Sequence, residues 1–262
     1  ELTRVYRSGI LGNVSYAEGE YIHPMDPKDA TQYISHPLHW RNFITPTYYS
    51  THALAPLMTM TGHMPKRVIG KQVLTKDEGQ ADRCTGGLLL VETDEGALFR
   101  IFGSAHFGCM ENWYRLGCDK GTVELVRGSN DYVRLVQNSW MYDMPLQAHE
   151  SVYLPRITAT DRDATNSGRR DDDFGHWGGD QSMLREFVQN VLEGRPPYMN
   201  VYRSAALTAV GILGWRSILE DSKQLDIPDF HKQEDRDMVR GDDLSPFPDE
   251  KGNVSLPHFY KQ

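Results

Sequence analysis

The feature that most constrains the fold is a series of short apolar segments separated by turn-forming residues. The clearest pair is residues 86–92 (GGLLLVE) and 97–102 (ALFRIF), which flank Thr-Asp-Glu-Gly at 93–96. A short turn that ends in glycine between two such runs is typical of a β-hairpin. Strands joined by turns this short pair antiparallel, because a parallel pair needs a crossover of a dozen or more residues.

Further strands are predicted on both sides of this hairpin. They cover residues 13–23, 67–75, 113–116, 122–126 and 132–136. Gly19 interrupts the alternation of the first of them and is expected to mark a bulge. Because most of the connections are short turns, the sequence predicts an open, largely antiparallel sheet.

Three helical patterns accompany the strands. Residues 202–220 are apolar on nearly every side, which predicts a helix buried against the sheet. Residues 180–193 carry six apolar side chains on one helical face, and residues 1–9 read as the end of an amphipathic helix with Gly9 as its cap. Strands followed by helices predict an α+β fold in which the helices pack on one face of the sheet.

The remaining segments suggest how the chain is divided. Residues 138–179 are polar, charged and rich in glycine, so we expect a long surface excursion there. We divide the chain into a substrate-binding and oligomerisation domain of residues 1–230 and a surface tail of residues 231–262. The sequence opens without Met inside a helical pattern, and we therefore expect a fragment whose N-terminal part is missing.

Charge and cysteine content limit the classes of partner. The formal net charge of −8 argues against a general nucleic-acid binder, which normally has a basic face. No apolar run approaches the roughly 20 residues that cross a bilayer, so no membrane partner is predicted. Cys84, Cys109 and Cys118 have no metal-type spacing, and we interpret them as reduced thiols of a cytoplasmic protein.

Residues 39–65 (HWRNFITPTYYSTHALAPLMTMTGHMP) are the best candidate for a binding pocket. Histidine, tryptophan, arginine and tyrosine precede an apolar run that predicts a short helix, and Gly62 stops it. Pro56 removes a hydrogen bond within that helix, which should kink there or start nearby. Trp40 offers a flat surface to the apolar face of a pyranose, and Arg41 offers a charged anchor.

Tyr49 and His52 are the candidate catalytic pair within that stretch. Three positions apart on a helical turn, their side chains share one face, with Cβ atoms about 5–6 Å apart. Together they can orient a sugar hydroxyl and pass a proton. The alternative is that both residues only cap and pack the helix.

Two other places supply candidate binding residues. His176 lies on a glycine-rich segment that leads to Asp180, whose carboxylate can accept hydrogen bonds from hydroxyl groups. Tyr21 and His23 lie at one end of the first strand and point to the same face. Each of these side chains also has an ordinary structural interpretation, as a loop residue, a cap or a core aromatic.

Several common catalytic motifs are missing from the sequence. It has no HExxH or similar metal pattern, no GxSxG nucleophile turn and no GxGxxG phosphate loop. We therefore predict no metal site, and any nucleotide should be bound mainly by something outside this chain.

The sequence resembles the C-terminal domain of the Gfo/Idh/MocA oxidoreductase family. The matching stretches are GILGNVSYAEGEYIH (9–23), YYSTHALAPLM (48–58), and the run from REFVQNVLEGRPP to SILEDSKQLDIPDF (185–230). The likeness is greatest to the NAD-dependent glycosidases, such as α-N-acetylgalactosaminidases, which share a Tyr-x-x-His before a small-Leu-small-Pro sequence, here Tyr49 to Pro56. They also have a loop comparable to His176, Gly178 and Asp180.

The resemblance implies a C-terminal substrate-binding domain of an NAD(P)-dependent oxidoreductase acting on a sugar. NAD or NADP would be held mainly by a Rossmann domain absent from this chain, and a homo-oligomer would form through the sheet. His52 and Tyr49 would be catalytic. The substrate-binding residues would be Tyr21, His23, Trp40, Arg41, His176 and Asp180.

The sequence also departs from the family pattern. The Rossmann glycines and the Glu-Lys-Pro segment with the catalytic lysine are absent, so this fragment should not transfer hydride by itself. Tyr48 stands where the family usually has an acidic residue or glycine, which favours the glycosidase-like variant. Three functions stay open: a sugar or polyol dehydrogenase, a redox-assisted glycosidase, and a non-catalytic binding or assembly domain.

Overall fold

A nine-stranded sheet organises the part of the chain that the structure describes. This computed structural model covers residues 1–24, 36, 39–75, 83–105, 108–138, 149–155 and 179–258. The strands are β1 (Val14–Ile22), β2 (Pro65–Thr75), β3 (Arg83–Thr93), β4 (Leu98–Ser104), β5 (Glu111–Cys118), β6 (Gly121–Val126), β7 (Ser129–Gln137), β8 (His149–Tyr153) and β9 (Leu225–Asp226). Their order is β8-β7-β6-β5-β1-β4-β3-β2-β9.

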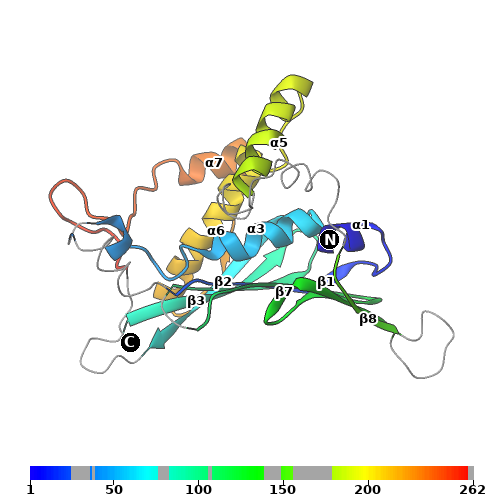
Figure 1. Cartoon of the computed structure of the whole chain (residues 1–262). Helices are drawn as coiled ribbons and strands as arrows, with labels where there is room; N and C mark the ends of the chain where they lie inside the picture. Colours follow the sequence, from blue (N-terminus) through cyan, green and yellow to red (C-terminus); the bar gives the residue numbers. More distant parts are fainter. Residues whose placement is uncertain are drawn as a thin grey trace.

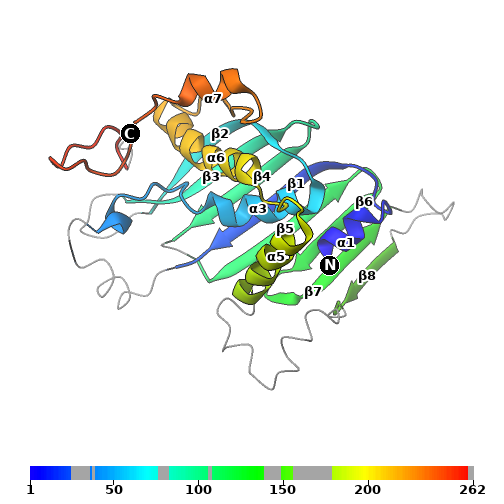
Figure 2. The same cartoon turned by 90° about the horizontal axis from the view of Figure 1, so that it is seen from above.

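The helices lie on one face of this sheet (Figures 1 and 2). They are α1 (Leu2–Arg7), the 3₁₀ helix η1 (Trp40–Asn42), α3 (Ser50–Thr61), α5 (Gly179–Glu193), α6 (Val201–Leu219) and α7 (Gln233–Val239). The predicted α+β class, with an open and largely antiparallel sheet and helices on one face, is confirmed. No helix among the described residues combines the length and the apolar character needed to span a membrane.

The core lies between the sheet and the two helices α3 and α6. From α3, Leu54 and Leu57 are fully buried, and Val210 of α6 is buried to the same extent. They pack over inward-facing strand residues such as Phe99 and Ile101 of β4. This burial explains why the helical pattern at 202–220 is apolar on nearly every side.

Both core helices approach the sheet closely at a glycine. A Cβ atom on Gly19 of β1 would lie 2.3 Å from the carbonyl oxygen of Ala53 in α3. A Cβ atom on Gly70 of β2 would lie equally close, at 2.3 Å, to the carbonyl oxygen of Gly214 in α6. Glycine is therefore required at these two strand positions because a helix backbone occupies the space of a side chain.

The structure corrects two details of the predicted strands. Gly19 marks no bulge, since the register of β1 shifts at its start, between Val14 and Tyr16. The pairing of β1 with β4 is parallel, in contrast to the other pairs, because α3 carries the chain back across the sheet after β1.

Two segments expected to be irregular contain regular structure. Residues 149–153 form β8, which pairs antiparallel with β7, so the expectation of one continuous surface excursion over 138–179 is wrong there. Helix α7 lies in the segment expected to be a surface tail. Strand β8 forms through its pairing with a distant part of the chain, which local periodicity does not report. Helix α7 has no buried residue, so it remains at the surface. The boundary at residue 230 stays a prediction.

Helix α5 carries the apolar face expected from its sequence, and this face is exposed. Figure 1 shows α5 projecting from the helical layer away from the sheet. Six of its apolar side chains are between 51% and 80% exposed: Met183, Leu184, Phe187, Val188, Val191 and Leu192. A contiguous exposed apolar stripe of this size is unusual on a monomeric protein.

The outer face of the sheet carries a ladder of ion pairs across neighbouring strands. Glu18 pairs with Arg100 and Arg115, Glu20 with Arg100 and Arg127, Glu124 with Arg115 and Arg134, and Glu150 with Arg134. Burial alone would raise the pKa of Glu20, but hydrogen bonds from Arg127 and Arg100 lower it below its usual value. Except for the pair of Glu20 with Arg127, which lies in the turn after β6, each pair joins adjacent strands, so the ladder favours the observed register.

Adding a methyl group at Gly19 should destabilise the fold. Gly19→Ala places a Cβ against the α3 backbone and should lower the free energy of unfolding by about 1–3 kcal/mol, as overpacking does. Gly103→Ala in β4 is the matched control, because the nearest atom to its Cβ would be 3.8 Å away. Urea denaturation measures both. Equal losses would mean that the strand conformation, and not the contact with α3, requires glycine.

Stability should fall below about pH 6.5 partly through His63. Burial lowers the pKa of His63 below its ordinary 6.5, although Asp94 and Glu95 act in the opposite direction. His63 therefore binds a proton more tightly in the unfolded chain than in the folded one. The stability that neutral His63 contributes is complete above pH 6.5 and is lost as the pH falls toward the lowered pKa.

The variant His63→Gln should reduce this dependence. Its melting temperature should fall less than that of the unmodified chain between about pH 7.5 and pH 5.5. Gln retains a polar group near the Thr93 hydroxyl, whose Oγ1 lies 3.1 Å from His63 Nδ1. Parallel melting curves for the two chains across this range would contradict the assignment.

Candidate functional site

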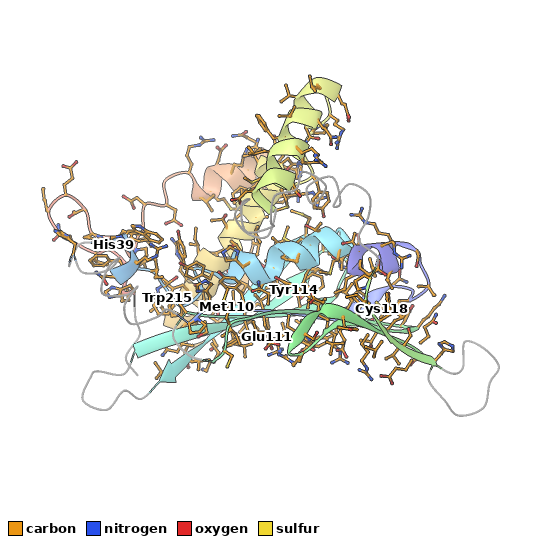
Figure 3. The ribbon with its side chains drawn as sticks, in the orientation of Figure 1. His39, Met110, Glu111, Tyr114, Cys118 and Trp215 are labelled. Carbon is orange, nitrogen blue, oxygen red and sulfur yellow. The ribbon has the colours of Figure 1, made fainter. Side chains whose placement is uncertain are left out.

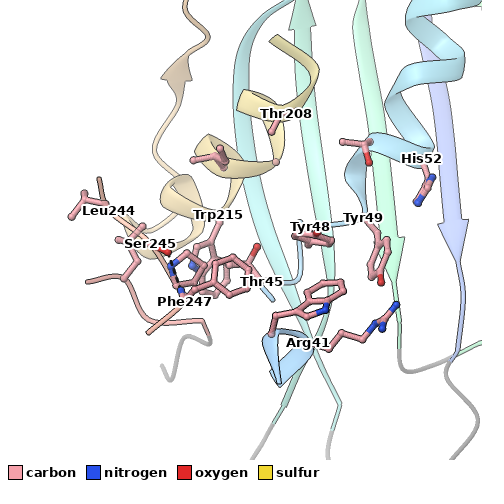
Figure 4. Close-up of a pocket in the computed structure, with 16 residues that line it drawn as sticks. Arg41, Thr45, Tyr48, Tyr49, His52, Thr208, Trp215, Leu244, Ser245 and Phe247 are labelled. Atoms are coloured by element: carbon pink, nitrogen blue, oxygen red, sulfur yellow. Dashed lines mark hydrogen bonds between the residues drawn. The ribbon is translucent and has the colours of Figure 1, made fainter. Parts of the chain in front are cut away.

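A cavity of about 690 Å³ opens where α3 begins (Figure 4). Its walls come from η1, the first turn of α3, the middle of α6 and residues 244–256. The volume is within the range of small-molecule sites, which are usually apolar with a few placed polar groups. The stretch 39–65 therefore supplies part of a cavity, as the sequence predicted, but not all of it.

The 3₁₀ helix η1 presents two of the predicted binding residues. The N–H of Arg41 donates to Nδ1 of His39 at 3.3 Å, which caps the short helix. The Arg41 guanidinium lies over the Trp40 ring, 4.6 Å from its centroid. Nε of Arg41 is buried and has no hydrogen-bond partner among the described residues.

The loop between η1 and α3 is fixed to α6 by a buried hydrogen bond. Thr47 is 1% exposed, and its hydroxyl donates to the carbonyl oxygen of Gly211 at 2.7 Å. A Cβ on Gly211 would lie 3.0 Å from Ser50 Oγ and 3.1 Å from the Thr47 carbonyl oxygen. Gly211 therefore allows the loop to approach the helix, and this contact sets the distance between two walls of the cavity.

Tyr49 and His52 lie side by side at the start of α3. Their rings stack with centroids 5.7 Å apart and an interplanar angle of 16°. Tyr49 is the N-cap residue, but its side chain makes no capping hydrogen bond. His52 is exposed. Both side chains line the cavity, so the pair can contact a ligand.

An aromatic side chain of strand β1 packs against this pair from the side of the sheet. The Tyr21 ring lies 4.3 Å from the His52 ring and 5.8 Å from the Tyr49 ring, and His23 stacks on Tyr21 at 5.8 Å. Burial raises the pKa of Tyr21 above its usual value, and Tyr49 adds to the shift. Tyr21 therefore stays protonated and neutral under ordinary conditions.

Tyr114 replaces a hydrogen bond that Pro56 removes from α3. Proline has no N–H to donate to the carbonyl four residues earlier, which belongs to His52. The Tyr114 hydroxyl donates to this His52 carbonyl at 2.9 Å, and α3 continues without a break from Ser50 to Thr61. Figure 3 shows Tyr114 between the sheet and the helical layer. Burial raises the pKa of Tyr114 to about 12, so it remains a donor.

Residues 244–247 and Leu256 form a cavity wall that the sequence analysis missed. Two contacts hold this part of the chain against α6. Trp215 Nε1 donates to the carbonyl oxygen of Pro257 at 2.7 Å, and Arg216 pairs with both carboxylate oxygens of Asp242 at 2.5 and 2.7 Å. The only sequence signal was the apolar residues Leu244, Phe247 and Leu256 within a charged, proline-rich segment.

The predicted site residues divide into three groups. Four of them line the cavity: Trp40, Arg41, Tyr49 and His52. Tyr21 lies behind this wall, in ring contact with Tyr49 and His52, and His23 stacks on Tyr21. Asp180 is in the first turn of α5 and is not a lining residue, and His176 lies outside the described residues. Within the described ranges, no three metal-ligating side chains come together.

Comparison with known proteins identifies the class of fold. Residues 165–236 match the family profile described as glycosyl hydrolase 109, C-terminal domain. This range includes most of the closing run, 185–230, that carried the resemblance in the sequence. No curated protein sequence matches the chain.

Solved structures extend the likeness to most of the chain. Levoglucosan dehydrogenase in complex with NADH and levoglucosan has a TM-score of 0.60 at 13% identity, over 87% of this chain and 62% of that one. An oxidoreductase domain protein from Kribbella flavida has a TM-score of 0.61 at 14% identity, over 87% of this chain and 62% of that one. UDP-N-acetylglucosamine 3-dehydrogenase from Acidithiobacillus ferrooxidans has a TM-score of 0.56 at 11% identity, over 84% of this chain and 58% of that one.

These comparisons confirm the resemblance to the C-terminal domain of the Gfo/Idh/MocA oxidoreductases. At 11–14% identity the solved structures show a shared fold. The chain spans about three fifths of the length of these structures.

The Tyr114 hydroxyl should stabilise α3 only because residue 56 is proline. Tyr114→Phe should lower the free energy of unfolding by about 1 kcal/mol, the usual contribution of a hydrogen bond. Pro56→Ala restores an N–H for the His52 carbonyl, so in that background the cost of Tyr114→Phe should shrink. Chemical denaturation of the single and double variants measures the coupling. A cost that is the same in both backgrounds would contradict this account.

Proposed function

We propose that this chain is the substrate-binding part of an NAD(P)-dependent oxidoreductase that acts on a sugar or sugar derivative. The observation that carries the proposal is the cavity in which Trp40, Arg41, Tyr49 and His52 converge. Levoglucosan dehydrogenase, which shares this fold, forms complexes with NADH and levoglucosan and with NADH and L-sorbose. Cys109 and Cys118 are free thiols, which supports a cytoplasmic location as part of the same proposal.

The polar end of the cavity suits a sugar ring. Trp40 is 40% exposed, so part of its indole is available to cover the C–H groups of a pyranose. The Arg41 guanidinium, held over that indole, donates to ring or hydroxyl oxygens. Tyr49 offers a hydroxyl that both donates and accepts. These groups bind and orient the substrate.

His52 is placed to move the proton of a sugar hydroxyl. Oxidation of that alcohol removes a hydride from carbon and a proton from oxygen, and NAD(P), when bound, accepts the hydride. The exposed imidazole of His52 takes the proton as a general base, with Tyr49 stacked beside it. NAD or NADP would be held mainly by a Rossmann domain outside this chain, as part of the same proposal.

A second candidate function is a redox-assisted glycosidase. The match of residues 165–236 to the C-terminal domain of glycosyl hydrolase 109 favours it specifically. In that reaction the sugar is oxidised transiently and reduced again. His52 and Tyr49 would therefore have the same role in proton transfer as in the dehydrogenase. A dehydrogenase accumulates reduced cofactor in step with product, whereas the glycosidase releases an aglycone with no net change in cofactor.

His52→Ala in the full-length enzyme should lower turnover by about 10²–10⁴-fold, the usual contribution of a general base. The melting temperature should change little, because the His52 side chain is exposed. Tyr49→Phe is the matched variant that keeps the ring stack and removes the hydroxyl. Unchanged turnover in His52→Ala would remove this residue from the mechanism. Absence of any calorimetric sugar binding to this chain would support a non-catalytic assembly domain.

We also propose that the chain forms a homo-oligomer through the open face of the sheet. No described helix covers that face, and it bears Leu90 and Leu98, which are 36% and 39% exposed. Half-buried Ile69, Leu88 and Phe102 extend the same apolar area across β2, β3 and β4.

Leu90→Arg should convert the oligomer to monomers in light-scattering measurements of mass. Met238→Arg on α7 is the control, because Met238 is 75% exposed and lies outside both this face and the apolar stripe of α5, and it should leave the mass unchanged. The interface assignment fails if Leu90→Arg stays oligomeric, or if the unmodified protein is a monomer at all concentrations tested.

A further inference from the structure

The cavity has two ends of different chemistry. Figure 4 shows Tyr49 and His52 on one side and Leu244, Phe247 and Trp215 on the other. Tyr48 lies between them, and its ring contacts the Trp40 ring at 5.7 Å. The function proposed above uses only the end that contains Arg41, Tyr49 and His52.

The second end is lined mainly by apolar side chains. Its wall consists of Ile212, Leu244, Pro246, Phe247, Leu256 and the ring of Trp215. None of these side chains is charged. A surface of this kind gains free energy by covering apolar groups of a ligand.

Several polar atoms at this second end are already engaged. Trp215 Nε1 donates to the Pro257 carbonyl at 2.7 Å. Ser245 N–H donates to Ser255 Oγ at 2.7 Å, and Ser245 Oγ accepts from Phe247 N–H at 3.0 Å. A second sugar ring placed here would bury hydroxyl groups with few partners, which is costly.

Contacts within the chain order this wall without a ligand. Leu256 N–H donates to the Ser245 carbonyl at 2.9 Å, which closes residues 245–256 into a loop. Arg216 holds Asp242 and lowers the pKa of its carboxyl group, and His258 packs edge-on against Phe43 at 5.4 Å. The apolar end is therefore formed before binding, and little ordering is needed when a ligand enters.

We propose that the substrate is a glycoside with an apolar aglycone, aromatic or hydrocarbon. Its sugar ring lies between Trp40, Arg41 and the Tyr49–His52 pair, and its aglycone lies against Phe247, Leu244 and Leu256. The cavity of about 690 Å³ accommodates a ligand of this size, whereas a sugar ring alone would leave the second end unfilled. The inference rests on the proposed sugar-binding function and adds the class of substrate, with residues 244–247 as specificity determinants.

Calorimetric titration of this chain tests the proposal. The probes are the methyl, phenyl and octyl glycosides of glucose, N-acetylglucosamine and N-acetylgalactosamine, with a disaccharide of each sugar. For the sugar that binds, the phenyl or octyl glycoside should bind at least about tenfold more tightly than the methyl glycoside, because it buries more apolar surface.

Variants of the wall separate the two ends of the cavity. Phe247→Ala and Leu244→Asn should each weaken binding of the phenyl glycoside by about five- to tenfold and change binding of the methyl glycoside less than about twofold. Leu244 is 48% exposed, so its replacement should not affect folding. Val254→Ala is the control, since Val254 belongs to the same loop, is 39% exposed and does not line the cavity.

The outcomes distinguish the two proposals. If the methyl glycoside binds but the phenyl and octyl glycosides bind no more tightly, the aglycone assignment is wrong and sugar binding stands. Tightest binding of a disaccharide also overturns the assignment, in favour of a second sugar. If no glycoside or sugar binds, the proposed function fails, and the aglycone assignment fails with it.

Discussion

The close contact between the backbones of α3 and β1 sets the geometry on which the rest of the site depends. At Gly19 the helix carbonyl of Ala53 occupies the space of a strand side chain. This contact lies one residue beyond His52 on the helix and two residues before Tyr21 on the strand. It therefore fixes the distance between their rings, which is 4.3 Å. A wider separation of helix and sheet would remove the contact of the Tyr21 ring with the Tyr49–His52 pair.

A second constraint is the placement of backbone polar groups near a proline. Pro56 leaves the His52 carbonyl without its helical donor, and the sheet supplies a replacement through Tyr114. The residue whose imidazole we assign to proton transfer is thus bonded through its backbone to β5. Helix α3 is held to the sheet at Gly19 by close packing and at Tyr114 by a hydrogen bond, and both contacts lie near the Tyr49–His52 pair. This arrangement favours a fixed orientation of His52.

The sequence predicted what depends on neighbouring residues. The hairpin at 86–102, the buried helix at 202–220 and the aromatic entry to α3 follow from turn residues and periodicity. Sequence resemblance added the sugar-binding interpretation. The features that the sequence did not predict depend on contacts between distant residues. They are the parallel pairing of β1 with β4, strand β8, and the hydrogen bond from Tyr114 to His52, which is 62 residues away. The cavity wall at residues 244–247 was missed for the same reason, since its order comes from α6 and not from its own pattern.

The two ends of the cavity would contribute to catalysis in different ways. An apolar wall around Phe247 contacts a part of the substrate that does not change during the reaction, so it binds ground state and transition state about equally. Such binding raises affinity and selects among substrates, and it accelerates the reaction only if it holds the sugar ring in the reactive position. In the proposed mechanism His52 would interact with the atom whose charge changes, so its contribution would grow in the transition state. Trp40 lies beside Arg41 at the sugar-binding end, so contact between its indole and the sugar ring would help to convert binding at the apolar end into orientation at the reactive end.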